Sequence, residues 1–418
     1  MMGDTNLIRE LFLQALGASL KGARVQWDME LTTQDWNELF SLAHEHQVLP
    51  MIFEATYACS AAKMADPRLM MAVRRQTMQS VMMQAMKTSE SLALMKHLRE
   101  AGLTPCVVKG IVCRNLYPHP DHRMSGDEDV LIPQMQAERC HEAMLAFGMQ
   151  MSDPKMERST AYEIPYGKLG SPIYIELHKS LFPPENDAYG DLNRFFDGVH
   201  ERTVQMDVGD VTIATLCPTD HFFYLICHSF KHFLHSGFGL RQVCDIVLFA
   251  NRYGAEIDWE KVKKNCEQIH AMQFTLALLK IGLVHFGFDP GAAQLPEDWP
   301  VEAMDEEPML CDLLDSGIYG DATMSRKHSS TMTLQAVEAD KQGKKGRHNL
   351  LRTLLPKRES LTGRYPYLVN KPYLLPVAWT SRIWVYVRRR NKKNDNTAES
   401  LKIAAERIEL MRKYGIIR

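Results

Sequence analysis

Two aspartates, two positions apart, lie in the most informative stretch of this chain, which reads Ser-Gly-Asp-Glu-Asp-Val-Leu-Ile over residues 125–132. If the stretch forms a strand, alternation places Asp127 and Asp129 on the same face, with their Cβ atoms roughly 6.6 Å apart. Carboxylates at that spacing can share one hard divalent cation or hold two cations about 3.5–4 Å apart. The alternative is a solvated turn in which the acids cap the elements that follow. The pair is therefore a candidate metal site, and the residues around it decide between the metal site and the solvated turn.

A third carboxylate lies on a later strand. Residues 173–178 read Ile-Tyr-Ile-Glu-Leu-His, and their alternation places Glu176 on the face opposite its apolar neighbours. His178 shares the face of Glu176 and is a candidate to tune a metal site or to contact phosphate. Magnesium-dependent nucleotidyl transfer uses such a carboxylate triad, because one cation activates the acceptor hydroxyl and a second neutralises the triphosphate and the leaving pyrophosphate. We therefore predict that Asp127, Asp129 and Glu176 are catalytic metal ligands.

Residues on the expected phosphate side precede the acids. Lys109 and Gly110 stand between a predicted strand and a predicted helix, 18 residues before Asp127. Glycine lets the backbone approach an anion, helix amides point at it, and lysine adds a point charge. Arg123 is a candidate to bind a triphosphate oxygen, or alternatively to position the aspartates through a salt bridge. Ser125 completes the predicted nucleotide-binding set together with His178.

The elements around these residues describe a small α+β unit. Its expected order is β-α-β-α-β-β, with one open sheet face. We expect strands at 104–108, 125–132, 160–166 and 172–177, and helices at 110–117 and 134–147.

The whole chain divides into five predicted regions. They are an N-terminal helical lobe (1–100), the α+β core (101–217), a helical domain (218–320), a polar flexible loop (321–349), and a C-terminal extended segment with helices (350–418). Within the first lobe, Met71, Met78 and Met82 recur at helical spacing, which predicts core packing rather than a binding groove.

Composition describes an ordinary globular protein of two or three domains. The chain has 418 residues, of which 45% are apolar and 24% charged. The nine cysteines form no Cys-x-x-Cys pair, which favours reduced, buried thiols, and no apolar run is long enough to span a membrane. Because the start also lacks a signal sequence, we expect a cytoplasmic protein. The net charge of −2 predicts no general DNA binding, and we interpret the basic run 388–393 as a solvated linker.

Two further clusters allow two interpretations each. His228, His232 and His235 have helical spacing and are either zinc ligands or, as we favour, histidines on a packed helix. Arg241 and Asp245 are four residues apart, which favours a structural ion pair over a role in nucleotide or acceptor binding.

The motifs also resemble those of a known family. The matching segments read Val-Lys-Gly-Ile-Val-Cys-Arg-Asn-Leu-Tyr-Pro (108–118), Arg-Met-Ser-Gly-Asp-Glu-Asp-Val-Leu-Ile (123–132) and Ile-Glu-Leu-His (175–178). They resemble the bacterial uncharacterised nucleotidyltransferases of the DNA polymerase β-like superfamily, over about residues 30–320. The resemblance implies an α+β fold, with a small polymerase β-like sheet that has helices on one face and helical lobes on either side. It also implies two Mg²⁺ ions, with Mn²⁺ as an alternative, an NTP substrate, and Asp127, Asp129 and Glu176 as the ligands.

The chain departs from the family pattern at two places. Lys109 and Gly110 replace the usual Gly-Ser ahead of the first acid. Between the aspartates, where an apolar residue is usual, stands Glu128. Either that face is partly open, or Glu128 meets a cation such as Arg123 or Arg139, or the site has degenerated.

Three functions follow from these patterns. The first is a magnesium-dependent nucleotidyltransferase that moves an NMP from an NTP to a small molecule, a protein or an RNA. The second is a catalytically degenerate protein of the same fold that acts as a binding or toxin-antitoxin-like partner, an interpretation that Glu128 and the lack of a Gly-Ser element favour. The third is a phosphotransferase, which shares the metal chemistry and differs in which phosphate moves.

Overall fold

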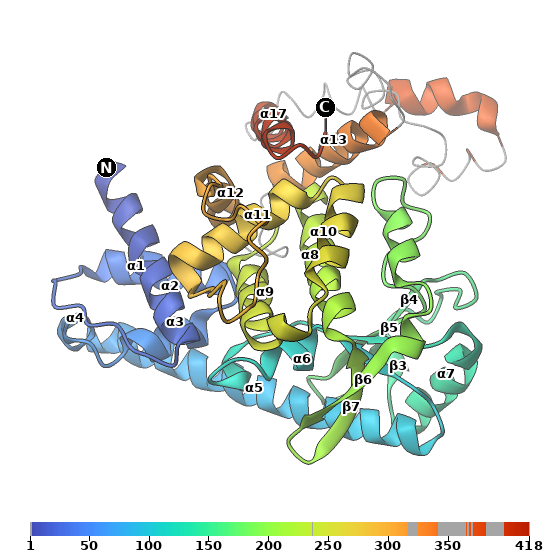
Figure 1. The fold of residues 1–418 in the computed structure, drawn as a ribbon, viewed down its shortest axis with the longest axis horizontal. Coiled ribbons are helices and arrows are strands. Elements are labelled where there is room, and N and C mark those ends of the chain that lie inside the picture. Colours follow the sequence, from blue (N-terminus) through green and yellow to red (C-terminus); the bar gives the residue numbers. More distant parts are fainter. Residues whose placement is uncertain are drawn as a thin grey trace.

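The α+β fold contains a seven-stranded mixed sheet, whose labelled strands lie at the lower right of Figure 1, between α5 and α7. The computed structural model describes residues 2–235, 237–316, 324–341, 365, 368, 371–381 and 397–417. The strands lie in the order β3-β4-β5-β2-β1-β7-β6. Their bounds are β1 (Cys106–Val108), β2 (Glu128–Leu131), β3 (Gln150–Met151), β4 (Glu163–Gly167), β5 (Tyr174–His178), β6 (Thr203–Val208) and β7 (Val211–Leu216). The predicted α+β class is confirmed, and β3, β6 and β7 are additional to the strands that we expected.

The strand pairs β2–β5 and β1–β7 are parallel, and the other neighbours are antiparallel. β6 and β7 form a hairpin in which Val208 pairs with Val211, so its loop has two residues, Gly209 and Asp210. Gly209 has φ of +61°, the left-handed conformation that two-residue hairpins need and that glycine adopts without strain. The hairpin extends the sheet beyond the four predicted strands.

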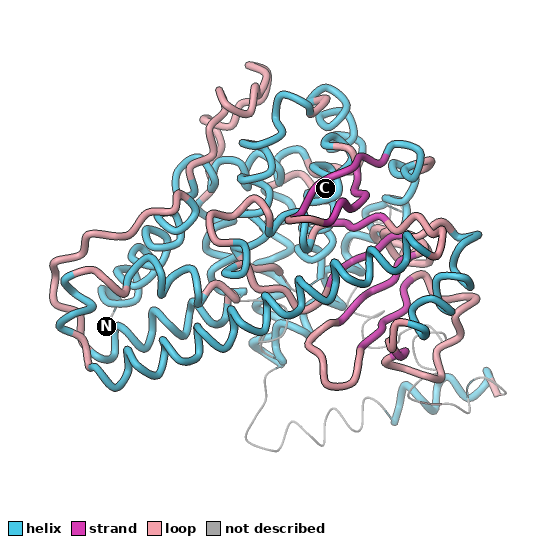
Figure 2. Tube along the Cα trace, turned by 90° about the horizontal axis from the view of Figure 1, so that it is seen from below, coloured by secondary structure: helices cyan, strands magenta, loops and turns pink. Residues whose placement is uncertain are grey.

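Five helices form the N-terminal part. They are α1 (Met2–Leu20), α2 (Thr33–Glu45), α3 (Leu49–Thr56), α4 (Ser60–Met64) and α5 (Pro67–Glu100). The Thr32 side chain accepts from the Asp35 amide and Asp35 accepts from the Thr32 amide, so a capping box starts α2. Figure 2 shows α5 as the long helix that runs from this helical part to the strands. It contacts both α3 and β7, so one rigid element joins the N-terminal helices to the sheet.

The prediction that three α5 methionines pack in the core is wrong. Met71, Met78 and Met82 are 65%, 62% and 58% exposed. The middle of α5 buries polar side chains instead, among them Gln84 and Lys87, because this face of the helix meets the loop ahead of β2 rather than an apolar core. Helical spacing of apolar residues therefore identified the wrong face of this helix.

Further helices of the described residues pack around the sheet and on one another. They include α6 (Gly110–Arg114), α7 (Ala137–Ala146), α8 (Pro218–His235), α9 (Leu240–Tyr253), α10 (Trp259–Gln268), α11 (Met272–Ile281), α12 (Glu307–Ser316), α13 (Met324–Lys341) and α17 (Thr397–Lys413). α8 ends at His235 and α9 begins at Leu240. The described residues contain no helix with the length and apolar character needed to cross a membrane.

The polar interval 321–349 differs from the loop that we expected. Residues 324–341 form α13, which lies beside α17 and α8 (Figure 1). Thr333, Ala336 and Val337 are buried at helical spacing, and the Thr333 hydroxyl donates to the Leu234 carbonyl at 2.8 Å. A few buried side chains thus suffice to dock a helix whose composition is mostly polar. Residues 342–349 and the basic run 388–393 lie outside the described part of the chain.

A buried histidine makes the stability of this fold sensitive to acid. The His46 ring packs on Phe12, its Nδ1 accepts from the Leu240 amide at 3.3 Å, and burial lowers the pKa of His46 to about 4. The unfolded chain binds this proton near pH 6.5 and the folded chain does not, so stability is lost as pH falls below 6.5.

We expect His46 to account for a loss of about 2 kcal/mol in the free energy of unfolding between pH 7 and pH 5. Urea denaturation at both pH values measures it. In His46→Asn, whose side-chain oxygen can replace Nδ1 as the acceptor, this part of the pH dependence should disappear, whereas His44→Asn at an exposed position should retain it. Equal pH slopes in the wild type and His46→Asn would refute the assignment.

Candidate metal centre

The register of two parallel strands brings Asp129 and Glu176 together. Asp129 on β2 pairs with Glu176 on β5, and Leu131 pairs with His178. Paired residues of neighbouring strands point to the same face, and so do residues two apart on one strand. Asp129, Glu176 and His178 therefore share one face of the sheet, as the alternation of their strands predicted.

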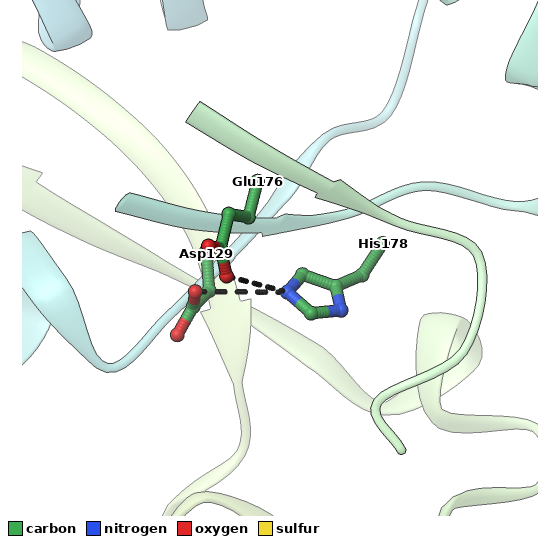
Figure 3. A group of neighbouring side chains, drawn as sticks. All are labelled: Asp129, Glu176 and His178. Atoms are coloured by element: carbon green, nitrogen blue, oxygen red, sulfur yellow. Dashed lines mark ion pairs between the residues drawn. The ribbon is translucent and has the colours of Figure 1, made fainter. Parts of the chain in front are cut away.

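These three side chains converge closely enough to hold one ion. One ligand atom from each lies within 4.8 Å of the other two (Figure 3). His178 Nε2 is 3.6 Å from Asp129 Oδ1 and 3.8 Å from Glu176 Oε2. The same nitrogen is buried and has no hydrogen-bond partner. An unsatisfied buried nitrogen facing two carboxylates fits a site for a divalent ion.

Lys109 supplies a fixed cation beside this group. Its ammonium lies 2.7 Å from Asp129 Oδ2 and 3.2 Å from His228 Nε2 on α8. Burial by itself would lower the pKa of Lys109, but the charges of Asp129 and Asp127 outweigh burial and raise it. Lys109 is therefore a permanently charged group that neutralises one oxygen of Asp129.

The Lys109 backbone has a conformation that L-residues rarely adopt. Its φ of +62° and ψ of −117° fall outside the regions allowed without strain, at a cost of order 1–3 kcal/mol. His221 helps to hold it, because the Lys109 amide donates to His221 Nε2 at 3.1 Å. The other ring nitrogen of His221 lies 3.2 Å from the Thr215 hydroxyl, which itself donates to the Val107 carbonyl. The end of β1 is thus positioned by a buried hydrogen-bond network.

The charges in the cluster are unevenly compensated. Burial would raise the pKa of Asp129, but Lys109 and then His178 hold that pKa well below its ordinary value. For Glu176, burial and the charges of Asp127 and Asp129 raise the pKa to about 8. Burial would lower the pKa of His178, but its contact with Asp129 raises it. The cluster therefore lacks positive charge at Glu176, where a divalent ion would supply it.

Asp127 stands just before β2 and outside the three-residue group. It is half-buried, and its charge acts on both Glu176 and Lys109. Because β2 begins at Glu128, the alternation that we assumed for residue 127 does not start there. Asp127 is near the cluster, but its role as a ligand stays a prediction.

Glu128 points to the other face and meets a cation that we did not name. It forms an ion pair with Arg114 of α6, and both side chains are 1% exposed. The Ile111 amide donates to Glu128 Oε2 at 2.8 Å and the Ser125 hydroxyl donates to Oε1 at 3.2 Å. The expected partners Arg123 and Arg139 are not the ones used. A buried charge in this position is fully paired, so it does not indicate a degenerate site.

Gly110 is required by this arrangement. Its φ is +21°, and a Cβ added there would lie 1.8 Å from Glu128 Oε2. Of the predicted nucleotide-binding residues, Gly110 and Ser125 therefore contact Glu128 on the face opposite Asp129.

Arg123 is committed to a structural ion pair. Its Nε and Nη2 donate to the two oxygens of Asp245 at 2.7 and 2.6 Å, and Tyr117 donates to Oδ1 at 2.7 Å. Burial would raise the pKa of Asp245, but Arg123 lowers it. Asp245 thus pairs with Arg123 rather than with Arg241, whose guanidinium donates to Gln47 and to the Met124 carbonyl. The structure does not bring Arg123 to the metal cluster.

The loop ahead of Asp127 is held by α5. The Lys87 ammonium donates to the carbonyls of Ser125 and Gly126 at 2.6 Å each, and Gln84 accepts from the Ser125 amide at 2.9 Å. These two polar side chains fix the approach of the backbone to β2.

Histidines and a lysine of α8 complete the site. His228 Nε2 lies 3.3 Å from His232 Nε2, and burial lowers the pKa of both rings well below the usual value. His235 instead contacts the Tyr189 hydroxyl at 2.6 Å, so the three histidines do not converge. Burial lowers the pKa of Lys231, and the negative charges of Asp129, Glu163 and Glu176 oppose that shift.

Sequence patterns missed two residues of this neighbourhood. Lys87 and Glu163 belong to none of the motifs, because they come from two other elements, α5 and β4. Glu163 pairs across strands with His178, and its Oε2 lies 3.9 Å from Nε2. The position of β4 was predicted, so the alternation of that strand could have indicated Glu163.

A separate cavity of about 390 Å³ lies beside α6. Its lining includes Val112, Asn115, Met206, His221 and Tyr253. Among the lining residues, His221 accepts from the Lys109 amide beside the metal cluster. The cavity therefore adds no ligand to the three-residue group.

A family of known proteins matches the part of the chain that holds the site. The sequence model of a family described as uncharacterised nucleotidyltransferase matches residues 32–283, which include all the elements of the metal cluster. No curated protein matches the chain.

Proposed function

We propose that this chain, which belongs to the uncharacterised nucleotidyltransferase family, moves a nucleoside monophosphate from an NTP to an acceptor. The observation that carries the proposal is the pairing of Asp129 with Glu176 on parallel strands, with His178 beside them on the same face. A divalent ion bound there would neutralise charge on the triphosphate and on the leaving pyrophosphate. The protein's part is to hold the ion and orient the nucleotide.

Each residue of the cluster has a proposed role. Asp129 and Glu176 supply carboxylate oxygens and His178 supplies Nε2. Lys109 lies at the end of β1, where its ammonium can turn from Asp129 Oδ2 to a phosphate oxygen, because both are anionic acceptors of charge-assisted hydrogen bonds. Lys231 on α8 is the second cation near these acids and would bind the same phosphates.

Asp127 has a conditional role in this proposal. If phosphate draws Lys109 away from Asp129, Oδ2 becomes available, and Asp127 and Asp129 can together hold a second ion. This is the two-ion arrangement that the resemblance implied, with Mg²⁺ or Mn²⁺. The acceptor is a small molecule, a protein or an RNA.

Labelled NTPs test the reaction class. The protein is incubated with a divalent ion and NTPs labelled at the α- or the γ-phosphate, together with separate pools of small molecules, proteins and RNA. We expect the α-label to enter a product and the γ-label to appear in pyrophosphate. Transfer of the γ-label to the product would indicate a phosphotransferase instead, and absence of both transfer and NTP binding would favour a non-catalytic partner protein.

The non-catalytic alternative had two sequence arguments, the charge at Glu128 and the lack of a Gly-Ser element ahead of the first acid. The ion pair of Glu128 with Arg114 gives that charge a structural explanation. We therefore favour the enzyme.

A further inference from the structure

The orientation of the His178 ring bears on which ion the site prefers. His178 Nδ1 lies 3.3 Å from the Ser180 carbonyl oxygen. A carbonyl oxygen can only accept, so Nδ1 carries the hydrogen and donates it. A carbonyl that accepts from one ring nitrogen fixes a metal-ligating histidine so that its other nitrogen faces the ion. Nε2 is thus the nitrogen presented to the carboxylates (Figure 3).

The spacing around Nε2 suits an ion better than a hydrogen bond. The nearest oxygens of Asp129, Glu176 and Glu163 lie 3.6, 3.8 and 3.9 Å away. These distances exceed the usual N–H···O range of about 2.7–3.2 Å. Ligand atoms bound at about 2.0–2.2 Å to one ion lie roughly 3–4 Å apart, and the distances from Nε2 to these oxygens fall in that range.

Lys109 limits what Asp129 can offer. Its ammonium occupies Asp129 Oδ2 at 2.7 Å, so Oδ1 alone faces His178. In the absence of nucleotide, the donor set is therefore one imidazole nitrogen with one oxygen each from Asp129 and Glu176.

We infer that this mixed nitrogen and oxygen site prefers Mn²⁺ to Mg²⁺, and that His178 Nε2 is the ligand that determines the preference. Mg²⁺ takes oxygen ligands and gives up its waters reluctantly, whereas imidazole binds first-row transition metals well. Mn²⁺ accepts both carboxylate and imidazole, which matches the donors present. This inference deepens the proposed function and rests on it for the identity of the ion-binding site.

Binding of MnCl₂ and of MgCl₂ to the nucleotide-free full chain, measured by isothermal titration calorimetry, tests the preference. We expect the ratio of the Mg²⁺ Kd to the Mn²⁺ Kd to fall about tenfold in His178→Gln, whose amide oxygen replaces Nε2, and in His178→Asp. The exposed His119→Gln is the matched control and should leave the ratio unchanged. An unchanged ratio in folded His178 variants, or no binding of either ion to the wild type, would overturn the inference.

A spectroscopic readout decides the matter even if both variants fail to fold. Electron spin-echo modulation of Mn²⁺ bound to the wild type should show coupling to a directly bound ¹⁴N nucleus, and a spectrum without that coupling would overturn the inference. The outcome is separable from that of the proposed function. NMP transfer with Mg²⁺ and no nitrogen coupling would reject only the inference, whereas nitrogen coupling without NMP transfer would reject only the reaction.

Discussion

Replacing Glu128 with alanine is expected to lower the free energy of unfolding by about 3–5 kcal/mol, because it leaves the buried Arg114 guanidinium without its counter-charge. Both side chains are 1% exposed, so water cannot replace the lost partner. Guanidinium denaturation measures the loss. The double variant Arg114→Met/Glu128→Leu, which replaces the ion pair by apolar side chains, should regain most of the stability.

An exposed ion pair is the control for this prediction. Arg158 and Glu138 lie 3.0 Å apart with side chains 32% and 69% exposed, so Glu138→Ala should cost less than about 1 kcal/mol. A Glu128→Ala variant as stable as Glu138→Ala would contradict a structural role for Glu128. It would also restore Glu128 as an argument for a degenerate site.

Replacing Glu176 with glutamine should separate stability from metal binding. With its pKa raised to about 8, first by burial and then by Asp127 and Asp129, Glu176 is mostly protonated at pH 7 in the ion-free protein. Its folded pKa exceeds the unfolded value near 4.5. The contribution of Glu176 to the free energy of unfolding therefore falls as pH rises from about 4.5 to 8. Glutamine resembles the protonated carboxyl and removes the penalty, so Glu176→Gln should be more stable than the wild type at pH 7.5 by about 1–3 kcal/mol.

The same substitution should remove a metal ligand. Without this ligand, the transition state of NMP transfer should lose several kcal/mol of charge stabilisation. We therefore expect the rate of NMP transfer to fall about 10³-fold in Glu176→Gln. Thermal melts with and without a divalent ion provide the readout, because a ligand that binds only the folded state raises its stability. We expect an ion-dependent rise in Tm in the wild type and little or none in Glu176→Gln. An equal rise in both would show that Glu176 does not hold the ion.

The sequence predicted the central part of the site because that part depends on local rules. Alternation predicted which face of its own strand each of Asp129, Glu176 and His178 occupies. The parallel register of β2 and β5 then brings the three side chains together. The α+β class and the family followed from the same motifs. These features are readable because a strand has a fixed period of two residues.

Other features depend on contacts that no local pattern encodes. Arg114 lies 14 positions before Glu128 on a different element, and Lys87 lies about 40 positions before the loop that it holds. A single sequence gives no distance between such elements, so we named the wrong partners for Glu128. The wrong prediction for the α5 methionines has the same cause. Residue spacing alone does not say which face of the helix contacts the rest of the protein.

One omission could have been avoided. Gly209 and Asp210 stand between two alternating runs, which is a recognised signal for a two-residue hairpin. Reading that signal would have predicted β6 and β7. By contrast, the exclusion of Asp127 from β2 could not be foreseen, because strand boundaries are the least reliable part of such a reading.

The most direct test of the central claim is whether nucleotide binding requires both a divalent ion and Asp129. Calorimetry with a non-hydrolysable NTP analogue answers this without knowledge of the acceptor, and circular dichroism establishes that Asp129→Asn is folded. We predict that the analogue binds the wild type only when Mn²⁺ or Mg²⁺ is present, and that Asp129→Asn does not bind it under either condition. Binding that is independent of the ion, or that survives unchanged in folded Asp129→Asn, would contradict the assignment of this cluster as the metal centre of a nucleotidyltransferase.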